Sequence, residues 1–258
     1  MKFIAAFRFL TVVPLPVRRE ATAEEVGGSI VYFPVVGLLI GLMLAALNWF
    51  LSLFLPAAIV IGLLMVSMVL VNGVLHLDGF IDTCDGLAGR KSAEERWQVM
   101  RDSRVGAFGV AGAVLLLLVK YVSLSSLPHG SVPQSLILMP VVSRWAMVYA
   151  IVAYPYARPS GLGTVFKQQA GWSSFIWATV FVVAASIVLA WWMKTTYFYL
   201  VGPAFLLAVW LVSVAWAHYL KAKFAGLTGD SYGAINEVAE VAFLIVMSLF
   251  GYNRWLWM

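Results

Sequence analysis

Three aspartates follow one another at helical spacing in the segment HLDGFIDTCDGLAGR, residues 76–90. Asp78, Asp82 and Asp85 stand at positions i, i+4 and i+7, so a continuous helix would place them on one face. Carboxylates this close repel one another, and the repulsion grows in a medium of low dielectric constant. A divalent cation would offset it, and carboxylate oxygens are the ligands that Mg²⁺ prefers. The spacing therefore predicts a Mg²⁺ site; the alternative is a polar helix end ringed by arginines such as Arg90.

A second block, MRDSRVGAFG at residues 100–109, carries groups suited to phosphate. Arg101 and Arg104 can present planar donor forks to phosphate oxygens. Asp102 is either another metal ligand or the partner of one of these arginines. The two glycines either let a ligand approach the backbone closely or simply begin a helix. Further on, Arg158 in YPYAR suits either phosphate binding or anchoring at a membrane surface.

Carboxylates return in the segment LTGDSYGAINEVAE, residues 227–240. Asp230 lies in a glycine-flanked turn that could close over a phosphate or a metal. Glu237 and Glu240, at i and i+3, face one way on a helix. Capping of a helix N-terminus is the alternative, and it explains Glu237 better than it explains Asp230. We expect Asp230 and Glu237 to contribute to the metal site opposite the three aspartates.

Other polar residues interrupt apolar stretches. His76 directly precedes the aspartates and is a candidate metal ligand, base or plain interfacial residue. Arg144 would be costly in lipid, so it should face the bundle interior and meet a carboxylate or substrate. Lys120 either does the same or extends outward to the interface. Cys84 is the one cysteine, so the chain forms no intrachain disulfide.

The elements that position these residues are predicted to be membrane helices. The chain has 258 residues, of which 62% are hydrophobic and 11% charged, whereas soluble domains carry roughly 25% charged residues. This composition excludes an ordinary soluble fold and predicts an all-α, polytopic membrane bundle forming a single domain over residues 1–258. Seven apolar stretches are long enough to span a bilayer, with six as the fallback: 33–55, 56–75, 108–127, 136–154, 174–193, 197–217 and 238–257.

The charges predict the orientation of the bundle. The N-terminus and the loops around 76–107, 155–173 and 218–237 carry 13 of the 17 lysines and arginines, and all 12 acidic residues. Because cytoplasmic loops are enriched in Lys and Arg, this side is predicted to be cytoplasmic and to hold the active face. The first residues, MKFIAAFRFL, predict an amphipathic helix lying on the membrane surface.

Residues 82–90, DTCDGLAGR, have the form D-x-x-D-G-x-x-[AG]-R. This resembles the opening half of the signature of membrane CDP-alcohol phosphotransferases, which hold metal between helices and displace CMP from a diphosphate by a hydroxyl. The closing half is absent, and Val99 stands where its glycine is needed. The resemblance therefore extends to the chemistry, and a lipid enzyme of that kind is an alternative function.

Short blocks are spread along nearly the whole chain: FRFLT at 7–11, YFPVVG at 32–37, HLDGFIDTCDG at 76–86, RDSRVGAFG at 101–109, YPYAR at 154–158, and TGD at 228–230 followed by Glu237. With these blocks in this order, the chain resembles the cobalamin synthase family of adenosylcobinamide-GDP ribazoletransferases. The resemblance implies bacterial inner-membrane, Mg²⁺-dependent enzymes that join adenosylcobinamide-GDP to α-ribazole or its 5′-phosphate and release GMP.

We expect the following division of roles among the candidate residues. The metal site would comprise Asp78, Asp82 and Asp85 with Asp230 or Glu237, and Asp82, or less favourably His76, would accept the proton of the attacking hydroxyl. The phosphates would be held by Arg101, Arg104 and Arg158, with Arg90 and Asp102 nearby. The expected partners are small-molecule substrates and membrane lipid, with homo-oligomers possible and no nucleic acid. A secondary transporter would need an inverted repeat that the sequence lacks, and a divalent-cation carrier would leave the arginines unexplained.

Overall fold

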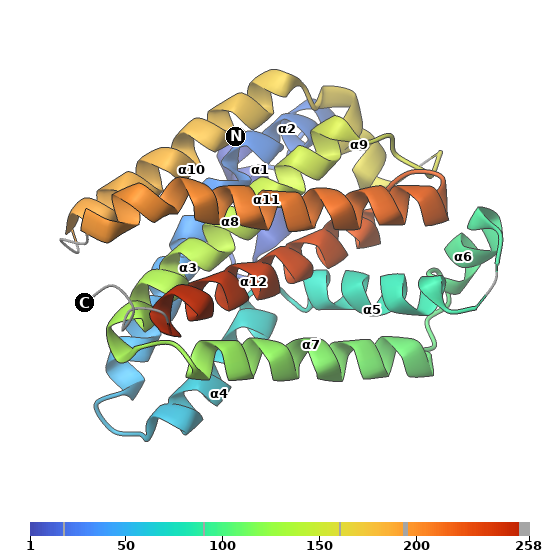
Figure 1. Ribbon diagram of the computed structural model, residues 1–258. Coiled ribbons are helices and arrows are strands. Elements are labelled where there is room, and N and C mark those ends of the chain that lie inside the picture. Colours follow the sequence, from blue (N-terminus) through green and yellow to red (C-terminus); the bar gives the residue numbers. More distant parts are fainter. Residues whose placement is uncertain (18, 90, 160, 193–195, 253–258) are drawn as a thin grey trace.

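The computed structural model describes residues 1–17, 19–89, 91–159, 161–192 and 196–252, and within these ranges the fold is entirely helical (Figure 1). A single isolated β-bridge joins Tyr156 to Leu227 in this part of the chain. The helices are α1 Lys2–Leu10, α2 Ala23–Gly27, α3 Phe33–Leu51, α4 Ala57–Val71, α5 Leu75–Leu87, α6 Ala93–Val99, α7 Ala107–Ser125, α8 Val132–Ala153, α9 Leu162–Gln169, α10 Trp172–Trp192, α11 Thr196–Phe224 and α12 Gly229–Tyr252, with 3-10 turns η1 Gly28–Tyr32 and η2 His129–Ser131.

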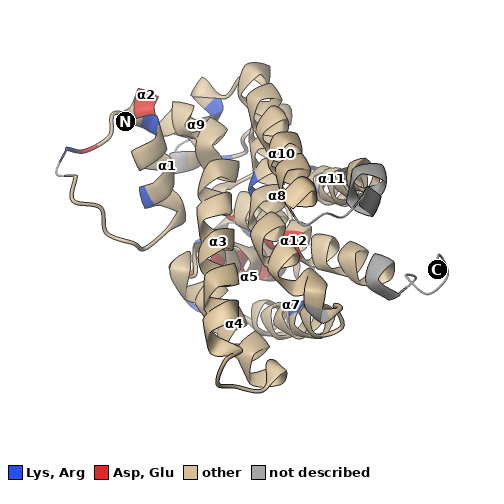
Figure 2. Cartoon of the chain, turned by 90° about the vertical axis from the view of Figure 1, so that its left-hand side faces the viewer, with Lys and Arg blue, Asp and Glu red and all other residues tan. Residues whose placement is uncertain are grey.

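The predicted membrane bundle of six to seven spans is confirmed. Six described helices are long and apolar enough to cross a membrane, and α4 with α5 makes a seventh if the bent pair counts as one span. Charged residues are sparse along the long helices, as Figure 2 shows. In Figure 1 the connection between α11 and α12 and the short helix α6 lie at the right, whereas the α7–α8 connection and the C-terminus lie at the left.

Helix α8 forms the centre of the bundle, and most of its residues are buried. It packs closely against α3 because two glycines of α3, four residues apart, face it. A Cβ atom added to Gly37 would lie 2.4 Å from the carbonyl oxygen of Pro140, and one on Gly41 would lie 2.5 Å from that of Ile137. Such small residues allow the backbones of two membrane helices to approach each other, which is a main source of their packing energy.

The predicted span over residues 56–75 does not form one continuous helix. Helix α4 ends at Val71, and α5 leaves it at an angle of 86°. At the bend, Gly73 and Val74 have positive φ angles of 59° and 64°, and the side-chain Nδ2 of Asn72 donates to the carbonyl of Met68 at 3.1 Å. The three aspartates therefore lie on a separate short helix, whose direction is set by the bend.

The predicted start of the last span, at residue 238, is also wrong. Helix α12 begins at Gly229, where the Thr228 hydroxyl accepts a hydrogen bond of 3.1 Å from the amide of Ser231. The acidic segment that reads as a loop is thus helical, and residues 253–257 of the predicted span lie outside the described ranges. The N-terminal helix is confirmed as α1, whereas its position at the membrane surface stays a prediction.

Candidate active site

Helices α5 and α12 touch at two glycines, and this contact brings the acidic segments together. A Cβ atom added to Gly79 would lie 2.8 Å from the carbonyl oxygen of Asp230, and one on Gly233 would lie 3.1 Å from that of His76. Asp230, at the start of α12, is therefore close to Asp78 on α5. In Figure 2 the acidic parts of α5 and α12 lie together at the centre of the view.

A cavity of about 380 Å³ opens beside this contact. Its charged side chains come from four segments that are far apart in the sequence: Asp78 from α5, Arg101 from the α6–α7 connection, Arg158 from the α8–α9 connection and Asp230 from α12. The rest of its lining is largely aromatic, apolar or glycine: Phe9, Leu75, His76, Met147, Ile151, Tyr156, Gly161, Gly163, Phe166, Gly229, Tyr232 and Gly233. The cavity therefore combines carboxylates with guanidinium groups.

Arg158 is held against Asp230 by local backbone structure. The amide of Ala157 donates to the carbonyl of Leu227 at 2.8 Å, and the amide of Leu227 donates to that of Pro155 at 2.9 Å. This pairing aligns the two segments, and the Arg158 Nη2 then lies 2.8 Å from the Asp230 Oδ2. Next to them, burial raises the pKa of the Tyr156 hydroxyl, which therefore stays a neutral hydrogen-bonding group at physiological pH.

Asp78 and Asp82 have no ion-pair partner among the described residues. Asp82 is half-buried and is repelled by the carboxylates of Asp78 and Asp230. No group of three or more His, Cys, Asp and Glu side chains in the described ranges has the arrangement of a preformed metal site. The donor chemistry nevertheless fits a divalent cation, because carboxylate oxygens without an ion-pair partner, such as those of Asp78 and Asp82, are the ligands that Mg²⁺ takes.

The metal-binding role predicted for Asp85 is not supported. Its two carboxylate oxygens accept hydrogen bonds from the amides of Gly106, at 2.7 Å, and Gly109, at 2.8 Å. Asp85 thus satisfies amides at the N-terminus of α7, where a negative charge is favourable. A Cβ atom on either glycine would lie within 2.5 Å of this carboxylate, so the two glycines make room for Asp85 and begin the helix.

The arginine block divides into two parts. Arg101 lines the cavity, whereas Arg104 is exposed and forms an ion pair of 2.7 Å with Asp102. The hydrogen bonds from Arg104 lower the pKa of the Asp102 carboxyl to about 2. The sequence left Asp102 as either a metal ligand or the partner of an arginine, and in the structure it is the partner of Arg104. Arg90, predicted to contact substrate, lies outside the described residues.

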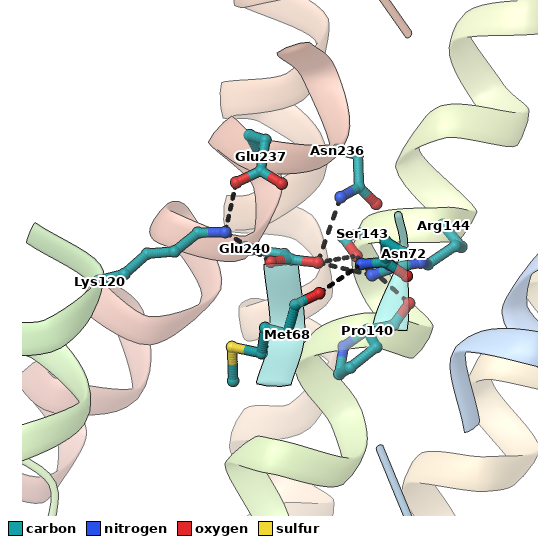
Figure 3. A network of polar contacts seen from close by, with 9 residues as sticks. All are labelled: Met68, Asn72, Lys120, Pro140, Ser143, Arg144, Asn236, Glu237 and Glu240. Atoms are coloured by element: carbon teal, nitrogen blue, oxygen red, sulfur yellow. Dashed lines mark hydrogen bonds and ion pairs between the residues drawn. The ribbon is translucent and has the colours of Figure 1, made fainter. Parts of the chain in front are cut away.

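Glu237 lies away from the cavity, in a buried polar network between α7, α8 and α12 (Figure 3). Its carboxylate is 2.5 Å from the Lys120 Nζ, which also lies 2.6 Å from Glu240. The other Glu240 oxygen accepts from Arg144 at 2.6 Å and from Asn236 at 3.2 Å. This placement corrects the prediction of Glu237 as a metal ligand, and it confirms that Arg144 faces the interior and meets a carboxylate.

Arg96 is a structural residue that the sequence pattern did not single out. Its buried guanidinium donates to the carbonyls of Gly86, at 2.7 Å, and Gly89, at 3.1 Å, at the C-terminal end of α5. A cation is favourable at a helix C-terminus. The indole of the next residue, Trp97, donates to the Phe224 carbonyl at 3.1 Å, so α6 holds the ends of both α5 and α11.

Comparison with known proteins gives a consistent result. Residues 2–248 match the family model described as cobalamin-5-phosphate synthase. Relatives named adenosylcobinamide-GDP ribazoletransferase include those of Geotalea daltonii, 36% identical over 96% of this chain and 97% of the relative, and Desulforamulus reducens, 37% identical over 94% of each. The relative of Pseudomonas putida is 34% identical over 96% of this chain and 99% of its own length. No solved structure matches the chain.

Proposed function

Since the chain belongs to the cobalamin-5-phosphate synthase family, we propose that the cavity beside the α5–α12 contact is where its transferase reaction takes place. The protein is a transferase of cobalamin synthesis, at the step that joins the lower ligand. The relatives are named for adenosylcobinamide-GDP and for the transfer of ribazole, and we propose adenosylcobinamide-GDP as the donor and α-ribazole or its 5′-phosphate as the acceptor. The observation that supports the cavity most is the meeting of Asp78, Arg101, Arg158 and Asp230 around one space.

The reaction asks these residues for positioning and charge compensation. A hydroxyl oxygen of the acceptor ribose forms a bond to the phosphorus that carries the cobinamide, and the bond from that phosphorus to GMP breaks. Arg101 and Arg158 are placed to donate to the phosphate oxygens in the fork geometry that guanidinium groups favour. We propose Asp82 as the acceptor of the hydroxyl proton, because it is a carboxylate without an ion-pair partner among the described residues.

We propose Asp78, Asp82 and Asp230 as the ligands of Mg²⁺. When bound, this cation neutralises charge on the diphosphate and on the departing GMP. Asp85 and Glu237 are left out of the set because their carboxylates are used by the amides of α7 and by Lys120. Arg158 compensates the Asp230 carboxylate in the structure described here, and substrate phosphate would offer Arg158 an alternative partner.

We further propose that the enzyme lies in the bacterial inner membrane with this cavity facing the cytoplasm. The support is the concentration of 13 of 17 lysines and arginines on the side that carries the cavity segments. Single cysteines, introduced into a Cys84→Ala background, test this placement. A cysteine at Gly130 should react with an impermeant maleimide in intact cells, and one at Ser103 only after the membrane is opened. The reverse labelling pattern would refute the orientation.

The function is tested with purified protein, both substrates and Mg²⁺, by measuring GMP release and the corrinoid product. Asp82→Asn removes one charge without changing the shape of the side chain, and we expect it to abolish turnover while the protein still inserts in the membrane. Asp102→Asn is the matched control, because Asp102 is an exposed carboxylate paired with Arg104, whereas Asp82 lies within electrostatic reach of the cavity residues Asp78 and Asp230. Near-normal product formation by Asp82→Asn would contradict the assignment.

A further inference from the structure

The cavity has a second wall that the transfer chemistry does not use. This apolar wall consists of Phe9 from α1, Met147 and Ile151 from α8, and Phe166 from α9. The rings of Phe9 and Phe166 meet edge to face, with centroids 4.9 Å apart. Met147 and Ile151 are one helical turn apart and so share a face of α8. A ligand that was only ionic would gain nothing from this wall, which therefore indicates a ligand with an apolar part.

Two buried polar atoms in the same lining lack partners. The Tyr232 hydroxyl and the His76 Nε2 form no hydrogen bond within the described residues. Their side chains are 3% and 2% exposed, and both residues line the cavity. Buried polar atoms in native structures are normally hydrogen-bonded, so the Tyr232 hydroxyl indicates a polar atom of a bound molecule. The His76 imidazole interacts instead with the charges of the buried network formed by Arg144, Glu240 and Lys120.

The size of the cavity limits what that molecule can be. Its volume of about 380 Å³ lies near the lower end of the roughly 300–1,000 Å³ typical of ligand pockets. This space suits one nucleoside and is too small for a corrin macrocycle with its side chains. A flat aromatic base would contact the apolar wall, while its sugar would reach the charged residues Asp78, Arg101, Arg158 and Asp230.

We propose that the apolar wall, with Tyr232, is the subsite for the base of the acceptor nucleoside. The base it fits is a flat, weakly polar heteroaromatic ring system, and the donor's corrinoid then lies outside this cavity. The inference rests on the proposed function, since it assigns the acceptor to the same cavity. It makes Phe9, Phe166 and Tyr232 determinants of which base the enzyme accepts.

The test compares two conservative variants with a matched control. Tyr232→Phe removes only the hydroxyl, and Phe166→Leu removes an aromatic face. The control is Phe3→Leu, which changes a phenylalanine of α1 that packs on Phe7 and Tyr32 outside the cavity. Binding of α-ribazole is followed by its own fluorescence in the absence of donor. KM is then measured for both substrates, and for a competing nucleoside with an amino-substituted purine base.

We expect Tyr232→Phe to weaken α-ribazole binding about fivefold, the effect of losing one hydrogen bond. Phe166→Leu should reduce the preference for α-ribazole over the purine nucleoside, and KM for adenosylcobinamide-GDP should stay within about twofold in both variants. The inference is overturned if KM rises for the donor alone, or if Phe3→Leu has the same effect as Phe166→Leu. Failure of the proposed function would look different, because wild-type protein would then release no GMP whether or not α-ribazole binds.

Discussion

Replacing Lys120 by Met should destabilise the protein strongly, because Lys120 is the shared cation of a buried network. The variant leaves Glu237 without an ion-pair partner, whereas Glu240 keeps Arg144 at 2.6 Å. The side chains of Lys120 and Glu237 are 4% and 8% exposed, so water does not replace the lost contact. Removing one partner of a buried pair costs about 3–5 kcal/mol, and we expect a loss of that size.

A second variant separates charge compensation from packing. Lys120→Met combined with Glu237→Gln removes one charge of each sign and leaves the Arg144–Glu240 pair intact. We expect this double variant to be more stable than Lys120→Met by about 2 kcal/mol. The free energy of unfolding is measured by tryptophan fluorescence during titration of detergent micelles with a denaturing detergent. Exposed Lys221 provides the control, since Lys221→Met should change stability by less than about 0.5 kcal/mol.

The reasoning is refuted if Lys120→Met costs less than about 1 kcal/mol, far below the range for a broken buried pair. It is also refuted if the stability losses of Lys120→Met and of Glu237→Gln, each measured alone, simply add in the double variant. Either result would mean that Glu237 does not depend on Lys120 for its compensation, and the role of Glu237 as a metal ligand would need to be considered again.

Three further variants address the geometry around the cavity. Asp85→Ala should cost about 0.5–2 kcal/mol of stability, as for a lost helix cap, and unchanged unfolding would contradict the contact with α7. Gly79→Ala should lower activity by pushing α5 from α12, where its Cβ would lie 2.8 Å from a carbonyl oxygen, whereas Gly62→Ala enters open space and should have no effect on turnover. Asp102 has its pKa lowered to about 2 by Arg104, so their pair is fully present above the ordinary pKa of about 3.9 and is lost as the pH falls toward 2. Asp102→Asn should therefore leave the pH profile of activity between about 5 and 9 unchanged.

Much of the fold follows from the apolar stretches of the sequence. Helices such as α3 and α7 begin within one residue of the predicted starts, because an unbroken apolar run of this length can satisfy its backbone hydrogen bonds in a bilayer in few ways other than a helix. The inward orientation of Arg144 was also predictable, since an arginine at membrane depth needs a partner. The bend after α4 was missed, although the Asn72-Gly73 dipeptide is a turn signal, because it lies inside an apolar run.

Roles within the acidic clusters were harder to predict. Helical spacing shows that Asp78, Asp82 and Asp85 share a face, but it does not show that Asp85 meets the N-terminus of α7. In the same way, Glu237 lies on α12 together with Asp230, but its side chain contacts Lys120, a residue more than a hundred positions away. Such assignments depend on which helices become neighbours, and periodicity within one helix carries no information about that.

Locating a divalent cation in the enzyme tests the proposed metal site directly. Mn²⁺ replaces Mg²⁺ in a complex with adenosylcobinamide-GDP, and its anomalous scattering marks its position in a crystal. We expect a peak between α5 and α12, bounded by the carboxylates of Asp78, Asp82 and Asp230, that disappears in Asp82→Asn. A peak beside Glu237 or Asp85, or one that persists unchanged in Asp82→Asn, would contradict the proposed site.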